Sequence, residues 1–501
     1  MKILTARQIR QVEERAFNGE FTEAGLMKSA GTACYERIIK KYSSSIGDKK
    51  TAVFCGNGKN AGDGFVIANL MHINGYDVSI VLADRMPEIA EPLMYYNEAV
   101  KNGVKVYQFD EYSFDCDFIV DCLFGIGFRG EPRAPFGDVI NAVNECGATV
   151  ISVDTPSGTD ATTGQVTTAV RADYTIAIST LKYAHILPPS NEYCGEITTV
   201  NIGIPEKYYD VCSVNTITKA DVKKVFPKRT KNAHKGSFGH QLNICGSYLM
   251  GGAAVICAKS ALKTGVGLLK CAFPKSLYLV MTAHLTQPIF KPLCENEDKT
   301  ISIGAVNDIF DEIRWADSVA VGCGLGNNDD TQVIVGQIIK NSEVPVVLDA
   351  DGINAVVPFI DIIKDKKAPL VITPHPAEMA RLIGEDTAYV QANRIDAAKA
   401  FAKENDCIVV LKGANTIVTD GIQVFVNTTG NPGMAMGGTG DMLTGMIASF
   451  IAQGLSALDA AKAAVYIHGL CGDITAAELS MCGMTVDDMI SLLGALMSEF
   501  E

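Results

Sequence analysis

Short apolar, β-branched runs alternate with longer helical patterns along the whole chain, and this alternation limits the possible folds more than any other feature. A strand, a helix and a second strand in succession build a parallel sheet that is covered by helices. The sequence therefore predicts an α/β protein. In the first half the expected strands are Thr51–Cys55, Val78–Leu82, Phe118–Asp121, Thr149–Val153, Tyr174–Ile178 and Ile197–Val200. In the second half they include Gln241–Cys245, Val319–Gly322, Pro345–Asp349, Leu370–Thr373, Ile408–Lys412 and Val424–Val426.

The chain of 501 residues is too long for one ordinary hydrophobic core, so at least two domains are expected. The first alternating series ends near residues 211–218, and a polar, basic stretch precedes the next strand. We place one domain at residues 1–213 and a second at residues 214–501. The two halves share no visible repeat, which argues against a duplication.

Composition excludes several classes of function. The formal net charge is -14, so the chain lacks the basic field that gathers nucleic-acid phosphates. Its 15 cysteines are scattered without a CxxC pair, which is typical of reduced thiols rather than of a disulfide framework or a zinc site. No apolar run has transmembrane length, and the N-terminus lacks the apolar core of a signal peptide. We expect a cytoplasmic protein that binds neither nucleic acid nor membranes.

The segment GGTGDMLTG, residues 437–445, combines four glycines with the start of an amphipathic run at Asp441–Gln453. A glycine-rich turn before a helix exposes free backbone N–H groups at the positive end of the helix dipole, which favours a bound phosphate. A carboxylate beside a phosphate is electrostatically unfavourable, so Asp441 is a candidate for proton abstraction. The alternative is that Asp441 only caps the helix. The motif alone leaves both interpretations open.

In the first half, Gly56, Gly58 and Ala61 match a G-x-G-x-x-A pattern at the end of a predicted strand. Two further strand ends are followed by glycine-rich loops. Parallel strands bring their carboxyl ends to one edge of a sheet, where ligands bind. Oxygen-bearing groups that meet there suit a cation or a sugar, although each could instead cap a helix or form a turn. The candidates are Asn60, Asp63, Asp121, Asp154 and Ser157.

The motifs GNGKNAGDG, DCLFGIGFRGE and DTPSGTDATTG resemble the epimerase domain of the NAD(P)H-hydrate repair proteins. That family often has NGGDG in the first motif, so Ala61 departs from it. The resemblance implies a Rossmann-like three-layer sandwich, a potassium ion held by Asn60, Asp121 and Ser157, and Asp154 as the candidate for proton transfer. It also implies a set of substrate-binding residues: Lys59, Asn60, Ala61, Gly62, Asp63, Gly125, Ile126, Gly127, Phe128, Arg129, Gly130, Glu131 and Asp154.

The second half contains KGSFGH at 235–240, a small-residue turn at Gly246–Ala254, ITPHPAEMARLIG at 372–384 and VVLKGANTIV at 409–418. Together with GGTGD, these motifs resemble the ribokinase-like fold, and most closely its ADP- or ATP-dependent NAD(P)H-hydrate dehydratase branch. Ser237 stands where the family often has aspartate, and the segment Tyr248–Met250 is atypical.

This resemblance implies that the nucleotide is bound by Lys412, Gly413, Ala414, Asn415, Thr416 and Gly440. The hydrated dinucleotide would face Ala253, Gly324, His375 and Asp441. Without the neighbouring motifs, His375 could be an ordinary loop histidine and Lys412 a solvated side chain. Asp349 and Asp351 fit either helix caps or a magnesium network, and capping is slightly favoured.

The two resemblances together imply a bifunctional enzyme. The first domain would interconvert the R and S forms of hydrated NADH and NADPH (NADHX and NADPHX), and the second would dehydrate the S form with ADP or ATP. The expected cofactors are K⁺ in the first domain and Mg²⁺ in the second, and a homo-oligomer is expected. The alternatives are a vitamin or sugar kinase, a non-catalytic dinucleotide-binding scaffold and a Rossmann dehydrogenase.

Overall fold

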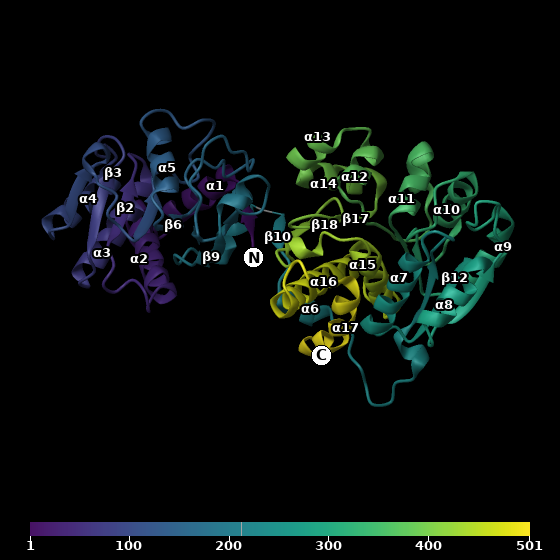
Figure 1. Ribbon diagram of the computed structural model, residues 1–501. Coiled ribbons are helices and arrows are strands. Elements are labelled where there is room, and N and C mark those ends of the chain that lie inside the picture. Colours follow the sequence, from purple (N-terminus) through teal and green to yellow (C-terminus); the bar gives the residue numbers. More distant parts are fainter. Residues whose placement is uncertain (212) are drawn as a thin grey trace. The chain divides into compact units, whose positions relative to one another are not determined.

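The structure, a computed structural model, describes residues 1–211 and 213–501 (Figure 1). Residue 212 falls within the predicted boundary segment and lies outside the described residues. The chain forms two compact units, Met1–Asn215 and Thr216–Glu501. Among the described residues, none of the helices combines the length and the apolar character needed to cross a membrane.

The first unit is built on a seven-stranded sheet whose neighbouring strands are all parallel. The sheet order is β4 (Lys105–Gln108), β3 (Val78–Leu82), β2 (Thr51–Cys55), β5 (Phe118–Cys122), β6 (Thr149–Val153), β7 (Tyr174–Ile178) and β9 (Glu196–Val200). A separate parallel pair joins β1 (Ile3–Leu4) to β8 (Leu181–Lys182). The helices are α1 (Ala6–Phe17), α2 (Glu23–Lys41), α3 (Lys59–Ile73), α4 (Ala90–Lys101) and α5 (Phe136–Glu145).

The central strands of this sheet carry apolar side chains on both faces, and helices cover both faces. One buried cluster joins α2, α3 and α4 to the sheet through side chains such as Cys34, Phe65 and Tyr95. A second cluster packs Val139 and Ile140 of α5 against the opposite face. The first unit is therefore the predicted three-layer Rossmann-like sandwich.

The second unit contains a ten-stranded sheet. Its strand order is β10 (Val214–Thr216), β19 (Val424–Val426), β18 (Ile417–Thr419), β17 (Ile408–Leu411), β16 (Leu370–Ile372), β15 (Val346–Leu348), β14 (Ser318–Val321), β11 (His240–Ile244), β12 (Leu268–Pro274) and β13 (Ile289–Leu293). Pairing is parallel from β13 to β17, whereas β17, β18 and β19 pair antiparallel. The parallel strands bring their carboxyl ends to one edge, where the motifs of this unit meet.

Twelve α-helices surround this sheet in the part of the chain that the structure describes. They are α6 (Lys219–Val225), α7 (Gly251–Thr264), α8 (Tyr278–His284), α9 (Val306–Ile313), α10 (Asp329–Asn341), α11 (Asp351–Val356), α12 (Pro376–Ile383), α13 (Thr387–Ala392), α14 (Arg394–Asn405), α15 (Thr439–Ala452), α16 (Ala457–Leu479) and α17 (Val486–Leu496).

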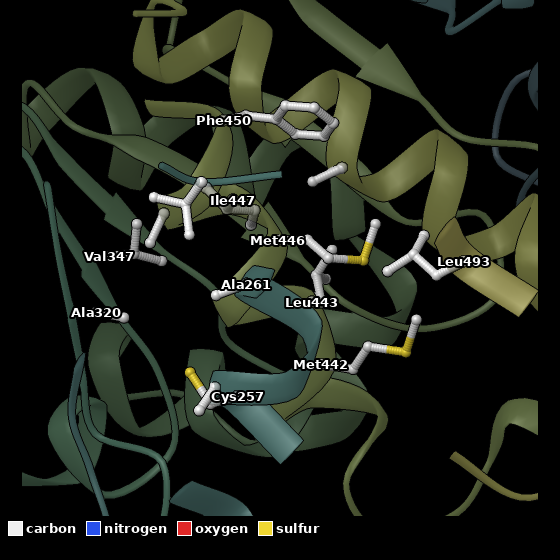
Figure 2. Close-up of a cluster of buried hydrophobic side chains, with 14 of the residues drawn as sticks. Cys257, Ala261, Ala320, Val347, Met442, Leu443, Met446, Ile447, Phe450 and Leu493 are labelled. Atoms are coloured by element: carbon white, nitrogen blue, oxygen red, sulfur yellow. The ribbon is translucent and has the colours of Figure 1, made fainter. Parts of the chain in front are cut away.

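Helix α15 is the centre of the largest apolar contact in the second unit (Figure 2). Ile447 and Phe450 are fully buried and belong to one cluster with Ala261 of α7 and Val347 of the sheet. Burial of a side chain of that size contributes about 1.5–3 kcal/mol relative to exposure. This packing fixes the glycine-rich start of α15 against the carboxyl edge of the sheet.

The predicted strands are all present, with ends that differ by no more than a residue or two. The structure adds strands that the periodicity did not reveal, among them β4, β13 and β18. β4 is short and partly exposed, and β13 carries Pro292, which removes a backbone donor and suits an edge strand. Such strands are stabilised by their neighbours rather than by a local apolar pattern.

Candidate active sites

Asp121 forms the centre of a polar cluster at the carboxyl edge of the first sheet. Its buried carboxylate accepts hydrogen bonds from the backbone amide of Ser157 at 2.9 Å and from the Ser157 hydroxyl at 2.5 Å. Asn60 donates to the carbonyl oxygen of Phe124 at 3.0 Å, and the Phe124 amide donates to the Ser157 hydroxyl oxygen at 2.8 Å. Burial raises the pKa of Asp121, and the hydrogen bonds from Ser157 oppose this rise. The three predicted cation ligands therefore lie together.

Asp154 follows β6 and adopts a left-handed backbone conformation with φ of 72°. Its carboxylate forms an ion pair with Lys182, whose side chain is only 1% exposed. The same ammonium donates to the carbonyl of Ile178 at 2.7 Å. Burial, together with the charge of Lys182, lowers the pKa of His185 to about 3. His185 is therefore neutral, and its Nε2 donates to the Asp154 carbonyl at 2.8 Å while its Nδ1 accepts from the Lys182 amide at 2.9 Å.

Two further acids face the Asp154–Lys182 pair. Burial, and then the charge of Asp154, raises the pKa of Asp63 well above its usual range. The pKa of Glu13, on α1, is raised by the same two causes in the same order. Carboxyls that share one cation titrate as a group, and the least solvated member keeps its proton longest. The site can therefore offer both a proton acceptor and a proton donor.

The predicted substrate residues at the start of α3 have different roles in the fold. Lys59 pairs with Glu23 of α2 at 2.6 Å. Ala61 is fully buried within the helical backbone, so alanine fits there in place of the family's glycine. A Cβ on Gly62 would lie 2.2 Å from the Met27 sulfur, so this glycine allows α2 to pack against α3.

The loop of residues 125–131 begins at the cation cluster and then turns outward. A Cβ on Gly125 would lie 3.4 Å from Asn60, so the backbone passes close to that side chain. The ring of Phe128 stacks on that of Phe124 with centroids 4.8 Å apart. Ile126 is half-buried, and the exposed members of the loop are Gly127, Arg129, Gly130 and Glu131. The loop can therefore close over a ligand without disturbing the buried cluster.

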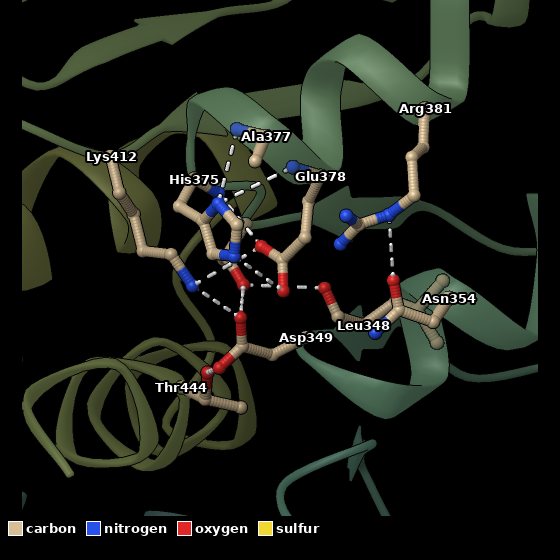
Figure 3. Close-up of polar contacts among 10 residues, drawn as sticks. Leu348, Asp349, Asn354, His375, Ala377, Glu378, Arg381, Lys412 and Thr444 are labelled. Atoms are coloured by element: carbon tan, nitrogen blue, oxygen red, sulfur yellow. Dashed lines mark hydrogen bonds and ion pairs between the residues drawn. The ribbon is translucent and has the colours of Figure 1, made fainter. Parts of the chain in front are cut away.

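In the second unit, Asp349 and Lys412 form the central ion pair (Figure 3). The ammonium of Lys412 lies 2.6 Å from one carboxylate oxygen of Asp349, which also accepts from Thr373 at 2.7 Å. The other oxygen accepts from Thr444 of α15 at 2.8 Å. Burial alone would raise the pKa of Asp349, but Lys412 and the hydroxyls outweigh it and lower that pKa. Asp349 thus joins β15, β16, β17 and α15.

His375 caps α12 through its imidazole. Its Nδ1 accepts from the amides of Ala377 and Glu378, at 3.1 and 3.3 Å (Figure 3). The carboxylate of Glu378 in turn accepts from the His375 amide at 2.7 Å. Burial lowers the pKa of His375, and an accepting Nδ1 leaves the proton on Nε2. Glu378 also lies 3.9 Å from Lys412. His375 is therefore a neutral donor at the same edge as the ion pair.

The glycine-rich segment begins α15 beside this pair. A Cβ on Gly440 would lie 3.4 Å from the Lys412 ammonium and 3.6 Å from Asp349, so bare backbone faces both charges. Gly438 is the N-cap, with φ of 97° and no side-chain cap. Asp441 lies in the first helical turn, and burial, then Cys323 and Asp349, raises its pKa to about 9. The amides at this helix start can receive an anion.

The remaining predicted nucleotide residues form the hairpin between β17 and β18. Gly413 has φ of 128°, and Asn415 adopts a left-handed conformation with φ of 56°. Thr416 donates to the Gly413 carbonyl at 3.0 Å. Buried Arg394 supports the hairpin by donating to the carbonyl of Lys412 at 3.2 Å. The predicted residues at 412–416, including Ala414, therefore form one tight turn beside the ion pair.

The predicted substrate residues Ala253 and Gly324 lie against each other. Gly324 has φ of 65°, and a Cβ there would lie 3.0 Å from the Cβ of Ala253. It would also lie 2.8 Å from the Cβ of Met250, within the segment that departs from the family pattern. Glycine at 324 therefore allows the turn after β14 to pack closely against the start of α7.

Comparison with known proteins identifies both halves of the chain. A family model described as NAD(P)H-hydrate dehydratase matches residues 242–494, and one described as YjeF-related protein N-terminus matches residues 23–184. The bifunctional NAD(P)H-hydrate repair enzyme Nnr of Moorella thermoacetica is 32% identical, covering 100% of this chain and 97% of its own length. The enzyme of the same name from Thermofilum pendens is 34% identical, with 100% and 98% covered. The chain belongs to the bifunctional NAD(P)H-hydrate repair enzyme family.

A solved structure supports this assignment for the second unit. The ADP/ATP-dependent NAD(P)H-hydrate dehydratase from Bacillus subtilis, co-crystallized with ATP and Mg²⁺, is 26% identical with a TM-score of 0.50. It covers 57% of this chain, and 99% of that chain is matched. The second unit of this NAD(P)H-hydrate repair family member therefore has the predicted ribokinase-like fold.

Three carboxylates for which the sequence allowed a capping role do not cap a helix through their side chains. Asp349 does not cap α11, because both its carboxylate oxygens are engaged by Lys412 and threonine hydroxyls. Asp351 begins α11 but accepts from the distant amide of Gly326 at 2.9 Å. Asp441 is not the N-cap of α15, since that position belongs to Gly438. The sequence suggested a cap for each carboxylate because a helix follows it directly. Asp349 and Asp351 instead bind partners that are distant in sequence, and α15 begins before Asp441.

Sequence reasoning missed several residues of these sites. Lys182 lies in an apolar stretch, STLKYAHIL, and a lysine surrounded by buried residues is a signal for a paired charge. Glu378 stands three residues after His375, the spacing of a capping box. Thr444 and Arg394 carry no such local signal, because each acts on a strand that is remote in sequence.

Proposed function

We propose that residues 214–501 dehydrate the S form of NADHX and NADPHX at the expense of ADP or ATP. We also propose that residues 1–213 interconvert the R and S forms. The observation that carries the first assignment is the position of Gly440, whose bare backbone faces Lys412 and Asp349 one residue before Asp441. A phosphate-binding helix start and a carboxylate of raised pKa are the two parts that transfer of a phosphoryl group to a hydroxyl requires.

Dehydration needs a better leaving group than hydroxide. Asp441 accepts the proton of the substrate hydroxyl as that oxygen attacks the terminal phosphoryl group of the nucleotide. The backbone amides of residues 437–440 stabilise the negative charge that develops on the phosphoryl oxygens. The ring nitrogen of the substrate then expels phosphate, and loss of a proton from the neighbouring ring carbon to solvent restores the double bond of the reduced nicotinamide. The products are AMP or ADP, inorganic phosphate and NADH or NADPH.

The ion pair of Lys412 and Asp349 positions the nucleotide. Because Asp349 satisfies Lys412 in the free protein, the ammonium is held at the start of α15 in one place. The hairpin at 412–416 lies on one side of the phosphates and His375 on the side of the hydrate. The Nε2 proton of His375 can be donated to the substrate, since Nδ1 already accepts two backbone amides.

Epimerisation requires proton exchange at the hydrated ring, which is acid–base chemistry. Asp154 is our candidate for the group that moves the proton. Lys182 forms an ion pair with Asp154, whereas the raised pKa of Asp63 favours a protonated neighbour. One carboxyl can then accept a proton while the other supplies one.

The residues near Asp121 fit a potassium ion. Their donor set is the Asp121 carboxylate, the Ser157 hydroxyl, the Asn60 amide oxygen and the Phe124 carbonyl, all hard oxygens. Potassium would supply a fixed positive charge beside the substrate loop at 125–131. Asn60 currently gives its amide nitrogen to the Phe124 carbonyl, so it would rotate to present oxygen instead.

Magnesium fits the second unit through the nucleotide rather than through a protein cage. Asp349 has both oxygens engaged, and Asp351 accepts a backbone amide, so the polyphosphate oxygens would be its principal ligands. Magnesium would supply charge neutralisation of the polyphosphate. The choice between ADP and ATP, a homo-oligomeric state and a cytoplasmic location stay predictions.

Replacement of Asp441 by asparagine tests the dehydratase assignment. We expect Asp441→Asn to lower dehydration by about 10²-fold or more, since it removes a general base, while nucleotide still binds. Recovery of reduced nicotinamide absorbance from mixed hydrate epimers, with ADP or with ATP, measures this. Release of free phosphate with NADH supports dehydration, and a stable phosphomonoester would instead show a kinase.

The matched control is Asp154→Ala, which removes the candidate acid–base group of the first unit. It should stop exchange of the epimers and leave dehydration of pure S hydrate intact. Unchanged exchange would show that Asp154 is not the group that moves the proton.

A further inference from the structure

Three buried thiols meet beside the start of α15. Cys245 follows β11, Cys257 lies in α7 and Cys323 follows β14, so three separate elements contribute them. Their sulfur atoms all lie within 4.8 Å of one another, and no thiol is more than 2% exposed. The mechanism proposed above uses none of these cysteines.

The spacing of these sulfurs is close to that of a thiolate metal site. Zinc–sulfur bonds of about 2.3 Å at tetrahedral angles put two sulfurs about 3.8 Å apart. The three thiols therefore need to move by about 1 Å or less to bind one ion. Three ligands from two strand ends and one helix also surround an ion from different directions, which a tetrahedral site requires.

A polar side chain contacts this group of thiols from outside. The side-chain amide of Asn243 donates to the Cys257 sulfur at 3.3 Å, a contact that orients a ligand from outside the site. Figure 2 shows the side chain of Cys257 on α7 at the border of the apolar cluster.

The cluster adjoins the candidate catalytic carboxylate. The sulfur of Cys323 lies within 4.8 Å of carboxylate oxygens of both Asp349 and Asp441. Asp349 is already engaged by Lys412 and two threonines, whereas Asp441 is part-exposed and has no cationic partner among the ion pairs of the described residues. The group of three thiols and the group of Cys323 with the two carboxylates share only Cys323, so an ion held by the thiols would act on Asp441 across that residue.

We propose that Cys245, Cys257 and Cys323 form a binding site for one thiophilic d¹⁰ cation, with zinc as the natural occupant, and that occupancy inhibits the second unit by holding Asp441. Binding replaces the thiol protons, which are released to solvent. The binding half of the proposal is independent of the proposed function, and only the inhibition rests on it.

Cadmium titration of the full chain tests the binding directly, because thiolate–cadmium charge transfer absorbs in the ultraviolet. The exposed Cys294 and Cys482 are first replaced by serine so that surface thiols do not contribute. We expect one tight site per chain with the intensity of three thiolates, and competition by zinc. Chelated protein without metal is the blank.

Two variants within the group of three thiols, and one control variant outside it, identify the ligands. Cys245→Ser and Cys257→Ala should each weaken cadmium binding by about 100-fold or more, since loss of a ligand costs at least as much as loss of a supporting residue. The matched control is Cys271→Ser on β12, a buried thiol outside the group of three, which should bind as the parent does. Thermal melting confirms that each variant is folded.

Inhibition is measured on the same proteins. Zinc at one equivalent should suppress dehydration by the parent and by the Cys271→Ser variant, and a chelator should restore it. The Cys257→Ala variant should resist zinc. If the cluster variants bind cadmium as tightly as the parent, or if Cys271→Ser weakens binding as much as they do, the three thiols only fill space and the proposed site is overturned. Tight binding without inhibition would overturn the regulatory half alone.

Discussion

Each unit has a lysine that forms an ion pair with a carboxylate at its candidate site. The two units differ in whether that carboxylate is itself the candidate catalytic group. In the first unit Lys182 pairs with Asp154 itself, the candidate acid–base group. In the second unit Lys412 pairs with Asp349, and Asp441 is left beside them with its pKa raised to about 9. In the first arrangement the lysine contacts the candidate group itself, whereas in the second the candidate carboxyl stays neutral at neutral pH.

This difference fits the two reactions. Epimerisation moves a proton back and forth, and the first unit places the candidate Asp154 near Asp63, whose raised pKa favours a protonated neighbour. Dehydration needs a polyphosphate next to the base, and a neutral Asp441 repels that anion less than an ionised one would. The lysine is then free to hold the phosphate region in place through Asp349.

Removal of each lysine is the harshest test of the comparison. Lys182→Met leaves Asp154 buried without its partner and should destabilise the first unit by about 3–5 kcal/mol. Lys412→Met should cost the second unit less, because the hydroxyls of Thr373 and Thr444 still donate to the Asp349 carboxylate. Calorimetry of the full chain, with a transition for each unit, measures both losses.

The paired neutral variants are the controls. Asp154→Asn together with Lys182→Met should recover much of the lost stability, as should Asp349→Asn with Lys412→Met, because no unpaired charge then remains. Double variants no more stable than the single ones would mean that packing of the lysine stems, rather than charge pairing, stabilises these sites.

The pH dependence of the two activities should differ next most strongly. The base form of Asp441 appears only as pH approaches its raised pKa, so dehydration should rise about tenfold per pH unit below about pH 9. Epimerisation by the same preparation should lack that rise. Measurements of kcat/KM for the hydrate across pH, at saturating nucleotide for dehydration, distinguish the two pH profiles. A flat dehydration profile from neutral pH upward would remove Asp441 as the base.

The smallest effects are expected at two glycines. Alanine at Gly440 meets only the Lys412 ammonium at 3.4 Å and Asp349 at 3.6 Å, so the fold should tolerate it and gain about 0.5–1 kcal/mol of helix stability. Its methyl group would occupy phosphate space, and nucleotide affinity should fall by about tenfold, or 1.4 kcal/mol. Isothermal titration with ADP and thermal melting record the two quantities.

Gly62 provides the contrast in the first unit. A Cβ there would lie 2.2 Å from the sulfur of Met27, so Gly62→Ala should cost about 1–3 kcal/mol of stability through overpacking. If Gly440→Ala destabilises the protein more than Gly62→Ala, the assignment of one glycine to ligand space and the other to packing is reversed.

Much of the fold was accessible from the sequence because it depends on local patterns. The runs at Thr51–Cys55 and Tyr174–Ile178 are strands with the predicted bounds, since buried parallel strands are apolar throughout. Edge strands such as β4 and β13 were not accessible, because they depend on the neighbour with which they pair. The loops at strand ends were found by their glycines and small polar residues.

The sequence by itself predicted the segments to which we assign the chemistry: the loops after β2, β5 and β6, the hairpin at 412–416 and the start of α15. Only the tertiary structure decided which charges meet. Asp349 lies 63 residues before Lys412 and 95 before Thr444, and Asp154 lies 28 before Lys182. The local sequence pattern reflects the backbone conformation that each residue prefers. The partner of a buried charge depends instead on strand order and helix packing, which involve parts of the chain that are distant in sequence.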